Sequence, residues 1–143
     1  MVTPGVKPTS SELGEPLGAS ECTAYRSRAM RGSYLAEDRP DIRYACREAA
    51  RLMKAPSTVG MELLKRTARF LVSHPRLAHR MEKQPPVIHG DGLSDANHAG
   101  CLRDRLSTGC TSLMHGGHMV KFSTGIQDRP DLSTAETEWY GLV

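Results

Sequence analysis

The sequence has few aromatic residues and no long apolar run. Phe, Trp and Tyr together make up 5% of the 143 residues, and there is one Trp. Because aromatic side chains supply much of the buried area of a core, their scarcity argues against one large, tightly specified core. The hydrophobic content of 38% suffices for one modest core or two small ones. No stretch approaches the roughly 20 apolar residues of a membrane span, and the N-terminus lacks the basic and apolar regions of a signal peptide. We therefore expect a soluble intracellular protein, cytoplasmic or nuclear, that is not secreted and has no membrane partner.

The four cysteines do not follow a pattern typical of disulfide or zinc proteins. No two of them form a Cys-x-x-Cys pair, so the framework of a small secreted domain is not indicated. Cys101, Cys110, His115 and His118 lie within eighteen residues of one another. The eight residues between the two cysteines far exceed the spacing of roughly two to four in structural zinc sites. We interpret this grouping as coincidence.

Positive charge is concentrated in the middle of the chain. The net charge is only +3, but residues 39–83 hold eleven basic and four acidic side chains, whereas residues 84–143 hold four and seven. A basic block beside an acidic one fits a nucleic-acid groove that leads to a metal-binding site. An Arg-rich helical face that is simply solvated is the alternative.

The first half of the chain is expected to be a linker followed by helices. Residues 1–20 are rich in Pro, Gly, Ser and Thr without apolar periodicity, which predicts a disordered linker. Residues 21–83 are predicted to be helical, and a short helix before Leu35 is only weakly indicated. A helix over residues 39–54 is better supported, with Asp38 as N-cap and Asp41 as the partner in a capping box. Its apolar positions recur at helical spacing: Ile42, Cys46, Ala49 and Met53.

A second helix is predicted over residues 57–73, antiparallel to the first across a short turn that contains Pro56. Its apolar stripe consists of Met61, Leu64, Ala68 and Leu71. Three basic side chains project beside this stripe: Lys65, Arg66 and Arg69. They either contact phosphates, which would give salt-dependent binding without sequence readout, or form a solubilising face.

Residues 84–143 are predicted to contain three strands followed by a helix. The strands are expected at 87–95, 109–114 and 119–122 after a Pro-containing linker at 83–86, with Gly116 and Gly117 in a type I′ hairpin turn. Ser133 is the predicted N-cap of the helix, and Glu136 its capping-box partner. An inward stripe of Ala135, Trp139 and Leu142 would place Glu138 at the edge of the buried face.

Five blocks of sequence resemble the Pol polyprotein of copia-type LTR retrotransposons. Residues 94–101 read S-D-A-N-H-A-G-C, close to the family's S-D-A-D-W-A-G-C, and residues 105–109 follow as R-L-S-T-G. Residues 133–142 read S-T-A-E-T-E-W-Y-G-L, close to S-S-A-E-A-E-Y-x-A-L. Upstream, residues 34–42 and 64–71 resemble Y-L-A-x-x-R-P-D-I and L-K-R-x-x-R-Y-L. The blocks occur in the family's order.

The resemblance implies an α+β fold: a helical segment like the reverse-transcriptase thumb, then a truncated βββα unit like ribonuclease H. It implies domains at 21–83 and 84–143, and Mg²⁺ held by Asp95 and Glu138 as catalytic metal ligands. The partner would be an RNA–DNA hybrid or duplex, and Lys65, Arg66 and Arg69 would bind it. Asn97, His98 and Phe122 replace the family's usual Asp, Trp and Trp, and neither Asn97 nor His98 is expected to be catalytic.

In the resembling domain a later strand carries a third carboxylate, and this sequence ends at Val143 before it. The expectation is therefore a Pol fragment whose ancestral role is metal-dependent hydrolysis of the RNA strand in hybrids and which is itself inactive. Two alternatives stay open: a non-catalytic nucleic-acid-binding module that uses the basic helices, or an inert remnant. The polymerase palm is absent from the sequence, so no polymerase activity is assigned.

Overall fold

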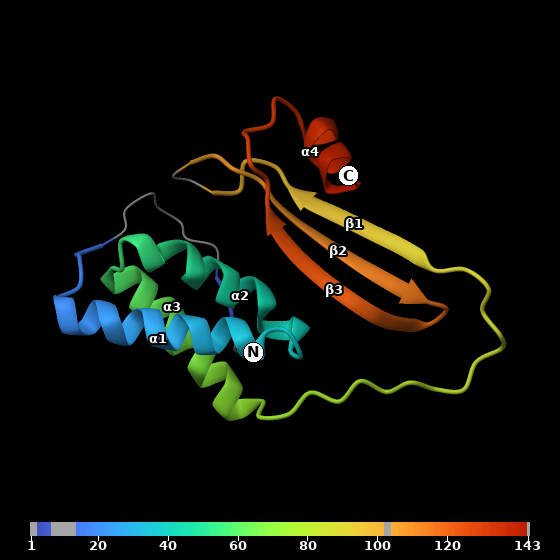
Figure 1. Cartoon of the computed structure of the whole chain (residues 1–143), viewed down its shortest axis with the longest axis horizontal. Helices are drawn as coiled ribbons and strands as arrows, with labels where there is room; N and C mark the ends of the chain where they lie inside the picture. The colour runs from blue at the N-terminus through green and yellow to red at the C-terminus, as the bar shows by residue number, and fades with distance from the viewer. Residues whose placement is uncertain (1–2, 7–13, 102–103, 143) are drawn as a thin grey trace. The chain divides into compact units, whose positions relative to one another are not determined.

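The chain forms two compact units, Met1–Ala78 and His79–Val143. The computed structural model describes residues 3–6, 14–101 and 104–142. The first unit contains helices, and the second contains an antiparallel sheet and a helix (Figure 1). The expected α+β class is therefore confirmed. Of the helices in the described ranges, none has the length and apolar character needed to cross a membrane.

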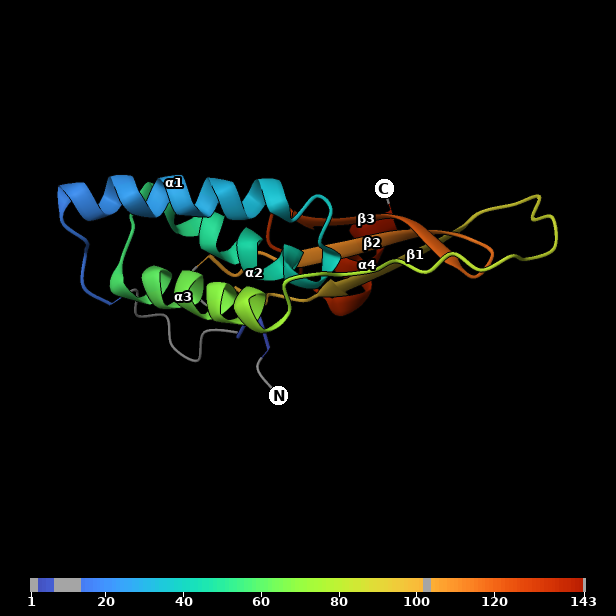
Figure 2. The same ribbon diagram turned by 90° about the horizontal axis from the view of Figure 1, so that it is seen from below.

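Three helices build the first unit: α1 (Ala19–Leu35), α2 (Pro40–Arg51) and α3 (Thr58–Ser73), with a 3-10 turn at Leu52–Lys54 after α2. Helix α2 lies between α1 and α3 (Figure 2). The predicted helices over 39–54 and 57–73 are confirmed. Helix α1 is longer than the short helix that the sequence indicates. Its buried positions are Tyr25 and Ala29, followed by Ala36 just beyond its end.

Tyr25 connects the three helices. Its side chain is fully buried, and its hydroxyl donates a hydrogen bond of 2.6 Å to the carbonyl of Ala49 in α2. A Cβ atom added to Gly60, in the first turn of α3, would lie 2.9 Å from the Tyr25 hydroxyl oxygen. Burial raises the pKa of Tyr25 to about 12. Because residue 60 is a glycine and has no Cβ atom, α3 can approach the aromatic ring of Tyr25 closely.

The core of this unit contains three of the four residues predicted for the stripe of the helix over 39–54; the fourth, Met53, lies in the 3-10 turn and is only partly buried. Ile42, Cys46 and Ala49 are each no more than 2% exposed. The stripe predicted for α3 is only partly right, because Leu71 packs on this core whereas Ala68 is exposed. Thr67 is buried instead, and its hydroxyl donates to the Leu63 carbonyl at 3.0 Å. A hydroxyl satisfied inside its own helix can be buried, and hydropathy does not reveal this.

The start of α2 differs from the predicted capping box. Arg39, and not Asp38, is the N-cap residue, and no side chain caps the helix. The Arg39 guanidinium donates to both carboxylate oxygens of Asp41, at 2.9 and 2.8 Å, and to the carbonyl of His74 at 2.9 Å. The hydrogen bonds from Arg39 lower the pKa of Asp41. The R-P-D-I block thus joins the start of α2 to the end of α3.

Of the predicted linker over residues 1–20, the described residues 3–6 and 14–20 make specific contacts, and residues 1–2 and 7–13 lie outside the described ranges. Pro16 pairs with Ser57 in an isolated β-bridge. The amide of Leu17 donates to Pro56 at 3.1 Å, and the amide of Thr58 donates to Glu15 at 3.0 Å. These are backbone hydrogen bonds, so a composition rich in Pro, Gly and Ser does not predict them.

The second unit is a three-stranded meander followed by a helix. It contains β1 (Asp91–Asn97), β2 (Thr108–His115), β3 (His118–Ile126) and α4 (Thr134–Leu142), and the strands are antiparallel in the order β1-β2-β3. The second and third predicted strands are confirmed, and β3 continues further than predicted. The first strand begins four residues later than the predicted start at 87 and runs on to Asn97.

The segment before β1 holds the hairpin turn instead of extending the strand. Gln84 donates to the His115 carbonyl and accepts from the Gly117 amide, each at 2.9 Å. Gly116 has φ of 60°, and Gly117 is not among the described glycines with positive φ. The prediction of a type I′ turn is therefore wrong, because positive φ at the first central position alone is the requirement of a type II′ turn.

Candidate functional site

Helix α4 packs against one face of the sheet through small side chains of β1. The Ser94 hydroxyl donates to the Gly141 carbonyl at 2.9 Å. A Cβ atom added to Gly141 would lie 2.8 Å from the Ser94 Oγ and 3.9 Å from the Ala96 Cβ. Ser94 and Ala96 therefore point toward α4, and the glycine allows the close approach of helix and strand.

The inward face of α4 is not the predicted one. Thr137 is fully buried and Gly141 is partly buried, whereas Ala135 is exposed and Trp139 is 66% exposed. The side chain of Leu142, the third residue of the predicted stripe, lies outside the described part of the chain. The predicted stripe followed apolar character. The helix instead turns its small and hydrogen-bonding residues to the sheet, because close packing and polar partners are available there.

Of the two hydrogen bonds predicted for the capping box of α4, only the one to the Ser133 side chain forms. The amide of Glu136 donates to the Ser133 Oγ at 3.2 Å, as expected. The Glu136 carboxylate accepts from the amide of Leu132 at 2.8 Å rather than from that of Ser133. Glu136 is therefore engaged at the start of the helix, as the sequence indicates.

A buried polar cluster surrounds Thr137, which the sequence analysis did not single out. The Thr137 Oγ1 lies 2.8 Å from the His98 Nδ1 and 2.9 Å from Asp131 Oδ2. The Gln127 side-chain amide donates to the Thr137 carbonyl at 2.8 Å. Asp131 is 9% exposed, and its Oδ1 has no hydrogen-bond partner among the described residues. The hydroxyl of Thr137 is thus the one described donor to the Asp131 side chain, and the Ser133 carbonyl, also at 2.9 Å, competes for the same proton.

One signal in the sequence could have revealed this cluster. At positions 98 and 137 the chain has His and Thr where the resembling blocks have Trp and Ala, and the structure brings these two side chains into contact. His98 therefore does not merely remove an aromatic packing group. It gains a polar partner on α4.

Asp95 lies on the sheet face opposite to α4. Side chains alternate along a strand, so the residue between Ser94 and Ala96 points away from the helix. Asp95 is exposed and pairs with Cys110, which in turn pairs with Thr124. Burial raises the pKa of the Cys110 thiol, and the charge of Asp95 raises it further. This electrostatic contact agrees with a common face for the two side chains.

The structure does not bring Glu138 to Asp95. Glu138 is exposed and follows the inward-facing Thr137, so it is turned from it by about 100° around α4. The two carboxylates begin on opposite faces of the sheet. Across the described ranges, no three His, Cys, Asp or Glu side chains are grouped as metal ligands. Asp95 and Glu138 in this arrangement do not fit one shared Mg²⁺, which prefers near-ideal octahedral oxygen geometry.

The predicted nucleic-acid-binding residues lie on α3 in different surroundings. Lys65 forms an exposed ion pair of 2.6 Å with Glu62. Arg66 donates to the carbonyl and the hydroxyl of Thr3, both at 3.0 Å. Arg69 is exposed. Lys65 and, less strongly, Arg69 lower the pKa of Glu62. Arg66 and Arg69 line one shallow hollow of about 400 Å³ on α3.

Comparison with known proteins assigns the class: the chain belongs to the retrovirus-related Pol polyproteins of transposons. It is 31% identical over 122 residues to the Pol polyprotein from transposon RE1 of Arabidopsis thaliana and 30% identical over 122 residues to that from transposon RE2. Each match covers 85% of this chain and 8% of the relative. No family model and no solved structure matches the chain. The resemblance indicated by the five blocks is confirmed.

Proposed function

We propose that this chain corresponds to the end of the reverse-transcriptase thumb and the first part of the ribonuclease H domain of a Pol polyprotein. Its ancestral role is hydrolysis of the RNA strand in RNA–DNA hybrids, and in the present arrangement the chain binds nucleic acid without cleaving it. The similarity to Pol polyproteins and the βββα order of the second unit support this proposal. The directions of the side chains of β1 decide whether the chain can cleave nucleic acid or only bind it.

The observation that carries the proposal is the direction of Ser94 and Ala96. Because these two side chains face α4, Asp95 and the helix that carries Glu138 are on opposite faces of the sheet. Two-metal hydrolysis needs ions roughly 3.5–4 Å apart, held by convergent ligands. Two divergent carboxylates would bind Mg²⁺ weakly and separately, so no hydrolytic step is derived from them.

Binding is attributed to the basic surface of the first unit. Within that unit, residues 39–78 hold nine basic and three acidic side chains, a charge of +6, and Arg66 and Arg69 line the same hollow on α3. Basic side chains on such a surface would contact the phosphates of a nucleic acid. The affinity would therefore be independent of sequence and would fall as salt concentration rises. The ion pair of Lys65 with Glu62 is exposed, and such pairs contribute little because solvent and salt screen them. A phosphate can therefore replace Glu62 as the partner of Lys65.

The first test compares two variants with equal charge change. Replacement of Lys65, Arg66 and Arg69 by Glu should abolish binding of an RNA–DNA hybrid in a filter-binding titration. The matched control replaces three exposed basic residues elsewhere by Glu: Arg31, Arg105 and Lys121. It should retain binding and most of the salt dependence, because it removes no proposed phosphate contact. Each phosphate contact that is lost changes the slope of log affinity against log salt concentration by about 0.9. Equal loss in both variants would show that only net charge matters.

The second test is a cleavage assay on the unaltered chain with a labelled hybrid and Mg²⁺. We expect binding without release of RNA fragments. Cleavage that disappears in Asp95→Asn would contradict the non-catalytic proposal. Absence of both binding and cleavage would favour the inert remnant.

A further inference from the structure

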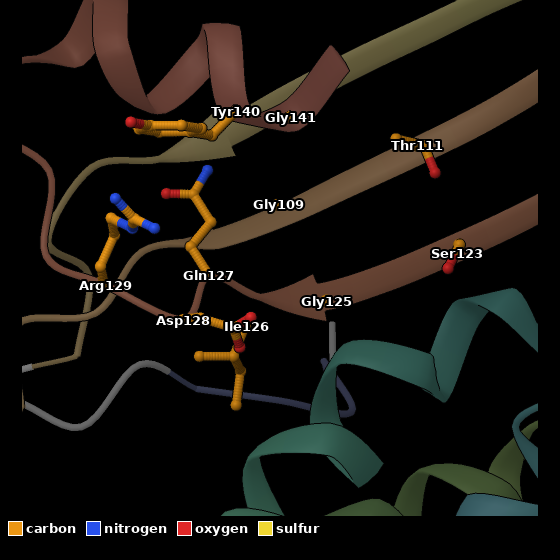
Figure 3. A pocket seen from close by; sticks show the side chains of 10 residues that line it. All are labelled: Gly109, Thr111, Ser123, Gly125, Ile126, Gln127, Asp128, Arg129, Tyr140 and Gly141. Atoms are coloured by element: carbon orange, nitrogen blue, oxygen red, sulfur yellow. The ribbon is translucent and has the colours of Figure 1, made fainter. Parts of the chain in front are cut away.

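A second hollow lies on the α4 side of the sheet, beside the helix (Figure 3). Its volume is about 440 Å³, within the range of roughly 300–1,000 Å³ that is typical of small-molecule sites. It belongs entirely to the second unit and involves neither Asp95 nor the basic residues of α3. Its lining comes from β2, β3, the segment after β3, and α4: Gly109, Thr111, Ser123, Gly125, Ile126, Gln127, Asp128, Arg129, Tyr140 and Gly141.

The floor of the hollow is bare backbone. Gly109 and Gly125 pair directly across β2 and β3. A Cβ atom added to Gly125 would meet nothing within 4 Å, and one added to Gly109 would meet only the Asp95 carbonyl, at 3.9 Å. Neither glycine has positive φ, so backbone conformation does not require glycine at these positions. What the two glycines provide is an open, flat surface on which a planar ring can lie.

An aromatic ring and a guanidinium group stand together at one end of the hollow. The Arg129 guanidinium lies 6.0 Å from the centroid of the Tyr140 ring, and Figure 3 shows both side chains beside Gln127, with Tyr140 on α4. Tyr140 is 40% exposed. Arginine is suited to phosphate, and aromatic rings are suited to stacking on a base. The carboxylate of Asp128 also lines the hollow and would repel a highly charged anion, so we expect weak binding.

Gln127 provides an unsatisfied acceptor in the wall. Its Nε2 donates to the Thr137 carbonyl, so the orientation of the amide is set by α4. Its Oε1 is buried without a hydrogen-bond partner among the described residues, although buried acceptors are normally satisfied. The N–H groups of a nucleobase edge would satisfy it after a small movement of the side chain. The hydroxyls of Thr111 and Ser123, paired across β2 and β3, are donors and acceptors suited to a sugar.

We propose that this hollow binds one nucleotide, with its base on the glycine floor beside Tyr140 and its phosphate at Arg129. The nucleotide is either free or part of a single strand. This site goes beyond the proposed function, because the proposed binding by the basic residues of α3 involves none of the residues that line the hollow. An aromatic side chain of a protein would also stack on the floor, but it would leave the arginine without a phosphate.

The test is a titration of the full chain, followed through backbone amide NMR signals, with uridine 5′-monophosphate and separately with a uridine tetranucleotide. Shifts should centre on Gly109, Gly125 and Gly141, with a Kd near the millimolar range. Gly125→Val places a side chain on the floor and should weaken binding by about tenfold or more. Gly92→Val is the matched control, because an added Cβ there also meets nothing within 4 Å and Gly92 does not line the hollow.

Arg129→Gln should weaken binding of the nucleotide but leave uridine itself unchanged. Tighter binding of the tetranucleotide would identify a strand as the source of the ligand, and equal binding a free nucleotide. The proposal is overturned if Gly125→Val and Gly92→Val have equal effects, or if inorganic phosphate causes the same shifts. Stronger shifts with N-acetyl-tyrosinamide than with the nucleotide would point to a protein ligand instead. Because the hybrid titration depends on α3, failure of either proposal leaves the other standing.

Discussion

Replacement of Thr137 by Val tests whether the buried polar cluster holds α4 on the sheet. Val has nearly the same shape as Thr, so the change removes the hydroxyl without leaving a cavity. Asp131, 9% exposed, would then lose its described donor at 2.9 Å, while His98 would lose its partner at 2.8 Å. A hydrogen bond to a charged group contributes about 1.5–3 kcal/mol, and an unsatisfied buried charge costs more. We expect the second unit to lose about 3 kcal/mol of its free energy of unfolding.

The assay uses the single Trp of the chain. Trp139 lies in α4, so urea unfolding followed by Trp fluorescence reports the second unit separately from the first. Thr134→Val is the control, because Thr134 is exposed in the same helix and surface changes usually stay within about 0.5 kcal/mol. A loss below about 0.5 kcal/mol for Thr137→Val, or an equal loss in the control, would refute the cluster's role.

Three predictions concern the first unit. Gly60→Ala should lower its melting temperature in circular dichroism, because a Cβ 2.9 Å from the Tyr25 hydroxyl oxygen costs about 1–3 kcal/mol and outweighs a helix-propensity gain of about 1. Arg39→Lys should flatten the acid limb of the stability curve: the lowered pKa of Asp41 contributes stability that is present above about pH 4 and lost as pH falls. At high pH, burial raises the pKa of Cys46 from 9.0 to about 11. The unfolding free energy should therefore fall as pH rises above 9, with Cys46 contributing up to about 3 kcal/mol by pH 11. Cys46→Ala should remove this contribution and leave the separate loss above pH 10 that follows from the raised pKa of Tyr25.

The sequence predicted best where hydrophobicity and structure coincide. Ile42, Cys46 and Ala49 form a helical stripe of apolar residues, and all three are buried. Helix α1 is only weakly indicated by the sequence, because its buried face contains small residues such as Ala29 and Gly32. Gly32 lies close to Cys46: a Cβ atom added to the glycine would be 3.2 Å from the cysteine sulfur. Small residues permit close packing but contribute little to an apolar pattern.

The candidate site was harder to predict because it depends on which face each element turns to its neighbour. A strand that contains Asp95 is recognisable, but its direction is fixed by the contacts of Ser94 and Ala96 with α4. On α4, apolar character favours Trp139 as the inward residue, whereas hydrogen bonding places Thr137 there. A polar cluster depends on side chains distant in sequence, so no local pattern predicts it.

The most direct test of the non-catalytic proposal is titration of the full chain with Mn²⁺, which prefers oxygen ligands as Mg²⁺ does and broadens the NMR signals of nearby amides. The arrangement of β1 and α4 predicts weak broadening around Asp95 and Cys110 that Asp95→Asn removes and Glu138→Gln leaves unchanged. Strong broadening of the residues around both Asp95 and Glu138, lost on either substitution, would show that the two carboxylates hold one metal and would contradict their placement on opposite faces.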